Sequence, residues 1–234
     1  MNADRSKIWK DIWNKKGDRK DLPIHQIDGF DLLSTDQWDD MVRQVTTAIG
    51  IRNGSSVLEC GCGAGAFLSS LLKIYPDLQV TGIDYSESLL EVVKSHISGD
   101  FYYADMSDIS FLQDNAFDNV VSFSTFHYLQ SIEAACKAVS EMVRVVKKGG
   151  VVFVGEVSDA AKYQQAVLIR QESHKDHRQV SLEKPDHLFL DKEVFKKIAK
   201  DLSLTLNIID QDEFDLAHYE TAKYRYSVYL TKTR

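Results

Sequence analysis

Short apolar runs alternate along the chain with segments in which apolar residues recur at helical spacing. The run "SSVLEC" at 55–60 predicts a buried strand, and "GAFLSSLLKIY" at 65–75 predicts a helix directly after it. The same patterns predict further strands over 78–84, 101–106, 117–124 and 151–157, and further helices over 86–97, 131–148 and 191–202. This rhythm is typical of βαβ units that build a parallel sheet.

Two more strands are predicted near the end of the chain, over 204–211 and 224–232. No crossover helix separates them, so we expect the last strand to be antiparallel to its neighbour. The pattern therefore predicts an α/β fold with a seven-stranded, mostly parallel sheet, an antiparallel last strand and helices on both faces. We expect the 234 residues to form one domain.

Composition and charge narrow the class of protein. The net charge of −7 and the absence of a basic stripe disfavour a nucleic-acid partner. No apolar run approaches the roughly 20 residues of a membrane helix, and the polar N-terminus lacks the apolar centre of a secretory signal. Three cysteines fit a reducing compartment. We therefore expect a soluble, cytoplasmic protein, with its oligomeric state left open.

The stretch "VLECGCGAGAF" at 57–67 joins the first predicted strand to its helix. Ligands of open α/β sheets bind at the carboxyl ends of strands, where this turn lies. Glycines at 61, 63 and 65 allow a sharp turn and a close approach of the backbone to a ligand. The free N–H groups of a helix that starts near Gly65 favour a negatively charged group such as a carboxylate.

Two ligand classes use such a turn. The spacing Gly61-x-Gly63-x-x-Ala66 satisfies the dinucleotide pattern, which predicts a nicotinamide or flavin enzyme. Glu59, however, would repel a pyrophosphate at the mouth of the turn, whereas it would attract a cationic ligand. S-adenosylmethionine, with a sulfonium and an ammonium, is such a ligand. An acid at Asp84, the end of the second strand, fits the ribose of either ligand.

Five motifs within 50–157 together resemble the class I S-adenosylmethionine-dependent methyltransferases of the small-molecule type. They are "ECGCGAG", the "GID" that ends in Asp84, "ADM" at 104–106, "FDNVVSFSTFHYL" and the glycine turn "VVKKGGVVFV". The resemblance implies a Rossmann-like fold, S-adenosylmethionine as cofactor and methyl transfer to a small-molecule acceptor by in-line displacement. The alternatives are an NAD-type oxidoreductase and a non-catalytic cofactor-binding partner subunit.

The resemblance also implies which residues bind the cofactor. They lie in the motifs and are Glu59, Gly61, Cys62, Gly63, Gly65, Asp84, Tyr85, Asp105, Met106, Ser122 and Phe123. The family's "N/D-P-P-Y/F" motif for planar amines is replaced by "SFST", so adenine is not expected as the acceptor. Whether oxygen, nitrogen, carbon or sulfur is methylated stays open.

Methyl transfer needs positioning and, for a neutral acceptor, removal of a proton. His127 in "STFHYL" is a candidate base because a histidine accepts protons near neutral pH. Glu156, at the end of the fifth strand, is a second candidate, for proton removal or for binding a cationic acceptor. The alternatives are that His127 packs or caps at a helix start and that Glu156 is a solvated loop acid.

Two segments outside the motifs are expected to cover the site: an N-terminal cap with a leading helix over 1–49 and an acceptor cap over 158–190. A C-terminal helix and strands over 191–234 complete the domain. Candidate acceptor contacts are Tyr128, Trp13, Arg170 and His174. Phe30 and Trp38 either border the pocket or pack in the core.

Neither cysteine nor histidine spacing predicts a metal site, because Cys60 and Cys62 lack a second ligand pair and the histidines of the cap lack a third fixed ligand. We expect the first 25 or so residues to become ordered over bound cofactor.

Overall fold

The computed structural model describes residues 5–19, 21–175, 186–216 and 218–233, and its seven strands form one sheet in the order β3-β2-β1-β4-β5-β7-β6. The strands are β1 (Ser56–Cys60), β2 (Gln79–Asp84), β3 (Asp100–Tyr103), β4 (Phe117–Phe123), β5 (Val146–Ser158), β6 (Thr205–Asp210) and β7 (Arg225–Thr231). Strands β1 to β5 pair in parallel, and β7 is antiparallel to both β5 and β6. The predicted sheet, including its antiparallel last strand, is confirmed.

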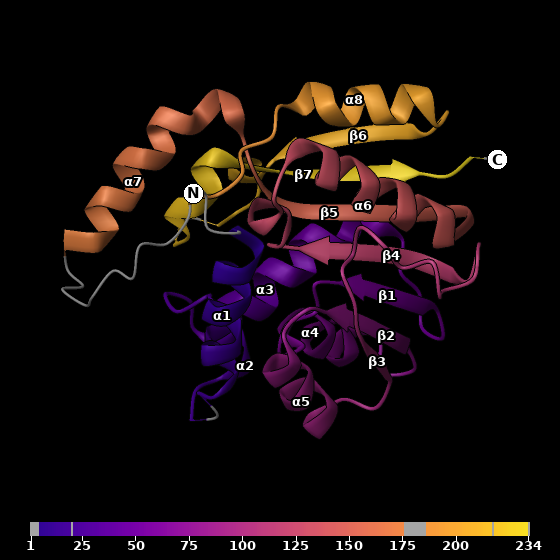
Figure 1. The fold of residues 1–234 in the computed structure, drawn as a ribbon, viewed down its shortest axis with the longest axis horizontal. Helices are drawn as coiled ribbons and strands as arrows, with labels where there is room; N and C mark the ends of the chain where they lie inside the picture. Colours follow the sequence, from indigo (N-terminus) through magenta and orange to yellow (C-terminus); the bar gives the residue numbers. More distant parts are fainter. Residues whose placement is uncertain (1–4, 20, 176–185, 217, 234) are drawn as a thin grey trace.

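Helices cover both faces of the sheet, as predicted (Figure 1). They are α1 (Arg5–Gly17), α2 (Ile24–Ile27), α3 (Thr35–Thr46), α4 (Ala66–Ile74), α5 (Glu87–His96), α6 (Ile132–Val145), α7 (Tyr163–Lys175) and α8 (Lys192–Asp201). Apolar residues of α3, α4 and α5 pack on one face, and those of α6 and α8 pack on the other. Because β1 and β4 lie between these two layers, their side chains are buried on both faces.

Polar residues fix where the helices begin. The Ser86 side chain accepts a hydrogen bond from the N–H of Leu89, which confirms the predicted cap of α5. Ser34 and Gln37 form a capping box at the start of α3. Helix α4 begins after Gly65, as the sequence predicts. These signals place the two helices that follow β1 and β2 with their first turns at one end of the sheet.

Three predicted boundaries differ from the structure by three residues or more, and one of them is the end of α6, at Val145 in place of 148. Strand β3 ends at Tyr103, so the "ADM" motif forms a loop beyond the sheet. Strand β5 begins at Val146, directly after α6, because this residue already pairs with Phe117 of β4 before the glycine turn. The turn is an interruption within the strand, and Gly149 adopts a φ of 80° there.

The N-terminal helices lie at the end of the sheet to which the arrow of β4 points, and α7 extends from the body near them (Figure 1). Helix α1 packs on α5, where the Ser88 hydroxyl donates to the backbone oxygen of Asn14 at 2.7 Å. Trp9 of α1 is buried. Helix α1 of the predicted N-terminal cap and the start of α7 in the predicted acceptor cap therefore lie near the carboxyl ends of the parallel strands.

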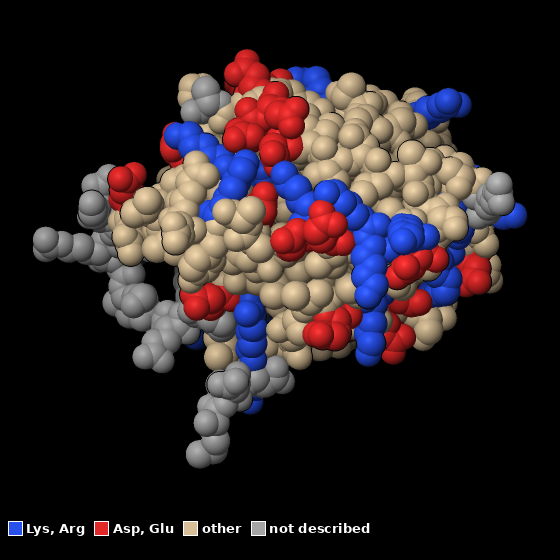
Figure 2. Space-filling view, turned by 90° about the horizontal axis from the view of Figure 1, so that it is seen from above, with Lys and Arg blue, Asp and Glu red and all other residues tan. Residues whose placement is uncertain are grey.

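Charges on the face shown in Figure 2 are mixed, with Asp and Glu side chains flanking the Lys and Arg side chains. On α8, for example, Lys196 donates to Glu193 at 2.6 Å. Within the part of the chain that the structure describes, no helix is both long and apolar enough to cross a membrane.

Candidate functional site

Three glycines follow β1, with φ angles of 77° at Gly61, 53° at Gly63 and 88° at Gly65. Such angles lie in the left-handed region, which glycine adopts without strain. A Cβ atom at Gly61 would lie under 3.0 Å from the side chain of Thr125, and one at Gly63 would be as close to the carboxylate of Asp28. The glycines are therefore required by the turn itself and by the approach of two other segments of the chain.

Asp84 ends β2 beside this turn. Its Oδ2 accepts a hydrogen bond from the N–H of Gly63 at 2.8 Å, and its Oδ1 accepts one from the N–H of Ser86 at 2.8 Å. Burial raises the pKa of Asp84 to about 6, against the effect of these hydrogen bonds. The carboxylate thus joins the glycine turn to the start of α5 and is held where a ligand can reach it.

Glu59 of β1 is 2% exposed, and its Oε2 atom has no hydrogen-bond partner among the described residues. Burial raises the pKa of Glu59 well above its usual value, and the charges of Asp28 and Asp84 raise it further. A buried carboxylate oxygen without a partner is costly. It indicates a site that a cationic or hydrogen-bond-donating ligand completes.

Asp28, which the sequence analysis did not single out, lies directly after α2. Its Oδ1 accepts from the N–H of Ala64 at 2.7 Å and its Oδ2 from the N–H of Ala66 at 3.0 Å. Burial raises the pKa of Asp28 to about 7. The prediction that a carboxylate binds at the start of α4 thus applies to a side chain of this protein. No sequence signal pointed to it, since its partners lie 36 and 38 positions away.

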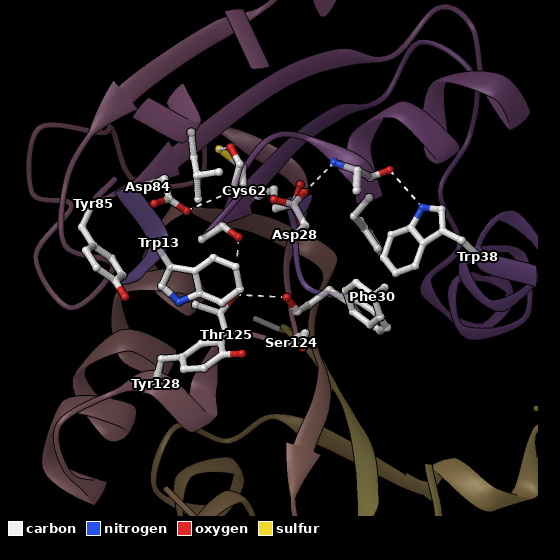
Figure 3. A pocket seen from close by; sticks show the side chains of 17 residues that line it. Trp13, Asp28, Phe30, Trp38, Cys62, Asp84, Tyr85, Ser124, Thr125 and Tyr128 are labelled. Atoms are coloured by element: carbon white, nitrogen blue, oxygen red, sulfur yellow. Dashed lines mark hydrogen bonds between the residues drawn. The ribbon is translucent and has the colours of Figure 1, made fainter. Parts of the chain in front are cut away.

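These acids line one pocket of about 510 Å³. In the view of Figure 3, Asp28 and Asp84 lie on one side of it, and the rings of Trp13 and Tyr128 lie on the other. Phe30 also lines it. The remaining lining residues are Trp38, Glu59, Gly61, Cys62, Gly63, Ala66, Phe67, Tyr85, Leu89, Phe123, Ser124 and Thr125.

Phe30 and Trp38 combine both predicted roles. Each lines the pocket and is also buried in the core, with 4.3 Å between the centroids of their rings. The Trp38 indole Nε1 donates to the backbone oxygen of Ala66 at 3.4 Å. The leading helix therefore forms one wall of the pocket.

A second hollow adjoins the pocket and shares Gly61, Asp84, Tyr85, Thr125 and Tyr128 with it. It has a volume of about 1390 Å³ and extends over the loop after β3 and the start of α6. The "ADM" loop contributes Ala104, Asp105 and Met106 to its lining.

Most of the predicted cofactor residues meet in these two hollows. Those that line the pocket, the second hollow or both are Glu59, Gly61, Cys62, Gly63, Asp84, Tyr85, Asp105, Met106 and Phe123. Gly65 and Ser122 line neither. Gly65 is packed against Val93 of α5, and Ser122 is fully buried in β4.

His127 lies in a short 3-10 helix, Phe126–Tyr128, beyond β4. Its ring is 1% exposed, and both ring nitrogens lack a hydrogen-bond partner among the described residues. Burial lowers the pKa of His127 well below its usual value, and the neighbouring His187 and Arg225 lower it further. The imidazole is therefore neutral at pH 7. The rings of Tyr128 and His187 lie 4.1 and 4.4 Å from it.

Glu156 is fully buried, in contrast to a solvated loop acid. Its carboxylate contacts the Arg225 guanidinium and the Gln211 amide, and it accepts a hydrogen bond from the Tyr219 hydroxyl at 2.8 Å. Burial lowers the pKa of Arg225 to about 10. An acid held by three donors is not free to take a proton from an acceptor, so this arrangement corrects the expectation of a catalytic Glu156 and favours a structural ion pair.

A third hollow, of about 1550 Å³, lies between α1, α7 and the residues around Tyr224. It shares Trp13 and Tyr128 with the first pocket. Its lining includes the predicted contact Arg170, together with Trp9, Tyr163, Asp186, His187, Phe189 and Tyr224. The side chain of His174, the other predicted acceptor contact, lies outside the described residues. So does His177. Over the part of the chain that is described, no three metal-ligating side chains cluster.

Comparisons with known proteins match this chain to methyltransferases. Residues 58–154 match the family described as "Methyltransferase domain". Over 133 residues the chain is 33% identical to a demethylmenaquinone methyltransferase of Staphylococcus aureus, and the aligned part covers 54% of this chain and 53% of that protein. The chain thus spans about half the length of the curated relatives it matches.

Two solved structures show the same fold. The plantazolicin methyltransferase BpumL in complex with S-adenosylhomocysteine has a TM-score of 0.62 at 14% identity, covering 86% of this chain and 85% of that one. Geranyl diphosphate C-methyltransferase from Streptomyces coelicolor, in complex with Mg²⁺, geranyl diphosphate and S-adenosylhomocysteine, has a TM-score of 0.60 at 14% identity, covering 82% and 78%. These similarities confirm the predicted Rossmann-like fold.

Proposed function

We propose that this protein, whose residues 58–154 match the methyltransferase-domain family, transfers the methyl group of S-adenosylmethionine to a small organic acceptor. When bound, the cofactor supplies a methyl group activated by a sulfonium, and it also has an ammonium group. The observation that supports the proposal best is the charge of the cofactor pocket. Asp28, Glu59 and Asp84 line it, and no Lys or Arg stands among its described lining residues.

The same observation disfavours a dinucleotide-dependent oxidoreductase. A pyrophosphate needs the free N–H groups at the first turn of the helix after β1. The amides of Ala64 and Ala66 are already hydrogen bonded to Asp28. Asp84 fits the ribose hydroxyls of the cofactor, and the second hollow, with Asp105 and Met106, fits its adenine.

We assign the aromatic hollow between α1 and α7 to the acceptor. Tyr128 lines all three hollows, and Trp13 lines both the cofactor pocket and the aromatic hollow. The two rings, 5.2 Å apart, therefore stand where donor and acceptor would meet. Enclosure by such rings excludes water and positions an acceptor, which supports methyl transfer.

The polar groups of this hollow suggest how an acceptor is oriented. Trp9 is 4% exposed, and its indole Nε1 has no hydrogen-bond partner among the described residues. Arg170 lies over the rings of Phe189 and Tyr224, at 5.5 and 5.6 Å. Both groups are donors. They fit an apolar or aromatic acceptor that presents a carbonyl, hydroxyl or carboxylate oxygen.

His127 is the proposed proton acceptor for a neutral substrate. Its ring is neutral and packs against Tyr128 and His187 of the acceptor hollow. The burial and cationic neighbours that lower its pKa also oppose protonation, so the role requires an acceptor whose proton is acidic when bound. A histidine that is 1% exposed needs the hollow to open toward it, or a proton path through these neighbours.

Calorimetry with S-adenosylhomocysteine and with NAD⁺ tests the cofactor assignment. We expect the first to bind and the second to give no heat. Transfer from methyl-labelled S-adenosylmethionine into the small-molecule fraction of a cell extract tests the activity. Tight NAD⁺ binding without a response to S-adenosylhomocysteine would contradict the proposal.

A further inference from the structure

The carboxylate of Asp28 lies against the first N–H groups of α4, although Asp28 is distant from them in the sequence. Its two oxygens accept hydrogen bonds from the N–H groups of Ala64 and Ala66, which flank the helix cap Gly65. The absence of a side chain at Gly63 leaves the space that the carboxylate fills. The segment between α2 and α3 and the glycine turn are thus complementary in shape and in hydrogen bonding.

This contact changes the charge preference of the helix end. The first N–H groups of a helix and its dipole together form an anion site. Here an anion of the protein itself fills that site, so a phosphate group of a ligand would find two amides taken and a negative charge in front of it. Each oxygen of Asp28 still has a lone pair, because a carboxylate accepts about four hydrogen bonds. The helix end therefore presents acceptors to the pocket in place of donors.

A second, independent observation points to a cationic ligand at this place. The Oε2 atom of Glu59 is buried and has no partner among the described residues, and Glu59 lines the same pocket. The pKa values of Glu59 and Asp28 are both raised, chiefly by burial and also by neighbouring acids. Lys16 also lowers the pKa of Asp28, and it is the smallest of the five causes. The acids thus lack a strong cationic partner, which a bound ammonium would supply.

We propose that Asp28 is a specificity-determining residue of the cofactor pocket: it fills the start of α4, excludes ligands with a phosphate there, and accepts the ammonium group of S-adenosylmethionine together with Glu59. This role rests on the proposed function. The competing role is that Asp28 only docks the N-terminal segment on the glycine turn, in which case it would affect all ligands of the pocket alike.

Three ligands with the same adenosine separate these roles by calorimetry. S-adenosylhomocysteine carries the amino-acid end, 5′-methylthioadenosine lacks it, and ADP has phosphates in its place. Asp28→Asn should weaken S-adenosylhomocysteine binding tenfold or more, as expected for the loss of a hydrogen bond to a charged group. The Kd of 5′-methylthioadenosine should change by less than about twofold, and ADP should bind more tightly. Asp36→Asn, at the exposed first turn of α3, is the matched control and should change none of the three.

Each outcome has one meaning. If Asp28→Asn weakens the binding of S-adenosylhomocysteine and of 5′-methylthioadenosine by equal factors, or changes the binding of neither, the specificity role is wrong while the proposed function stands. If the wild-type protein itself prefers ADP, the proposed function and the specificity role both fail. Should Asp28→Asn not fold, the wild-type protein gives a test without a variant: S-adenosylhomocysteine should bind at least about tenfold more tightly than 5′-methylthioadenosine, and ADP should bind least tightly. ADP binding as tight as that of 5′-methylthioadenosine would overturn the role.

Discussion

The proposed cofactor half and the proposed acceptor half of the site are built in different ways. Around the glycine turn, the contacts are made by the backbone: positive φ angles at three glycines, and N–H groups bonded to Asp84 and Asp28. Around the acceptor hollow, the contacts are made by rings, such as Trp9 against Tyr128 at 4.6 Å. Backbone contacts require particular residue types at fixed spacing, whereas ring contacts accept many combinations.

This difference explains where sequence similarity lies. The family match covers residues 58–154, which include the glycine turn, Glu59 and Asp84, and ends before α7. The caps contribute Trp13, Arg170 and His187 outside that range. A glycine turn constrains sequence because alternatives are strained. An aromatic wall can change its residues and thereby its acceptor, which is how one cofactor site serves many substrates.

The largest expected effect tests whether the cofactor half depends on its backbone. Gly63→Ala should reduce the free energy of unfolding by about 2–5 kcal/mol, because it adds left-handed strain to a collision with the Asp28 carboxylate. Gly54→Ala is the matched control: Gly54 also has positive φ but has nothing within 4 Å of a Cβ atom. Gly54→Ala should reduce the free energy of unfolding by the backbone strain alone, about 1–3 kcal/mol. Urea unfolding measures both. Equal losses of unfolding free energy in the two variants would show that the Asp28 side chain moves aside without destabilising the fold.

The next effect tests whether the acceptor half contains the proton acceptor. His127→Asn should lower turnover by about 100-fold, the usual contribution of a general base, and leave the affinity for S-adenosylhomocysteine unchanged. The pH profile of kcat distinguishes this from packing, because loss of a base removes its titration from the profile. Unchanged turnover would reduce His127 to a packing residue.

A smaller effect should be confined to the acceptor. Arg170→Gln should raise the KM for the acceptor by about tenfold, near 1.4 kcal/mol, because it removes a charged donor from the aromatic hollow. The Kd of S-adenosylhomocysteine should not change, since Arg170 lines only the acceptor hollow. Arg43→Gln, which breaks an exposed pair with Asp40, is the control. A change in cofactor affinity would show that the two halves are coupled.

The same division separates what the sequence could and could not predict. The strands, the caps at Ser86 and Gly65, and the acids Glu59 and Asp84 follow from local patterns, because each depends on its neighbours in the chain. Asp28 does not, since an acid before a glycine is common in loops and its partners are 36 and 38 positions away.

The surroundings of the two candidate catalytic residues could not be predicted for a related reason. Glu156 lies near the end of β5, as predicted, yet its role depends on Arg225, 69 positions away. The ring of His127 likewise packs against His187, 4.4 Å away, which comes from the predicted acceptor cap over 158–190. Residues whose environment is made by distant segments need the tertiary structure.

The smallest effect concerns the stability cost of the acids in the cofactor half. Burial raises the pKa of Asp28 to about 7 and of Asp84 to about 6, whereas an aspartate in the unfolded chain titrates near 3.9. The folded protein therefore holds these protons more tightly than the unfolded chain does. Their contribution to stability is fully present below about pH 4 and is lost as the pH rises through 6 and 7.

The Tm of the ligand-free protein should accordingly fall between pH 5 and 8, by about 2–4 °C for each kcal/mol lost. Asp28→Asn removes one of the two titrations, so its Tm should fall less over the same range. Saturating S-adenosylhomocysteine should reduce the slope in the wild-type protein, because a bound ammonium favours the charged carboxylates. Melting curves at four pH values, with and without ligand, make the comparison. Parallel slopes for the wild-type and Asp28→Asn proteins would mean that Asp28 is already ionised in the folded protein, and that the cofactor half tolerates its acids without the cation.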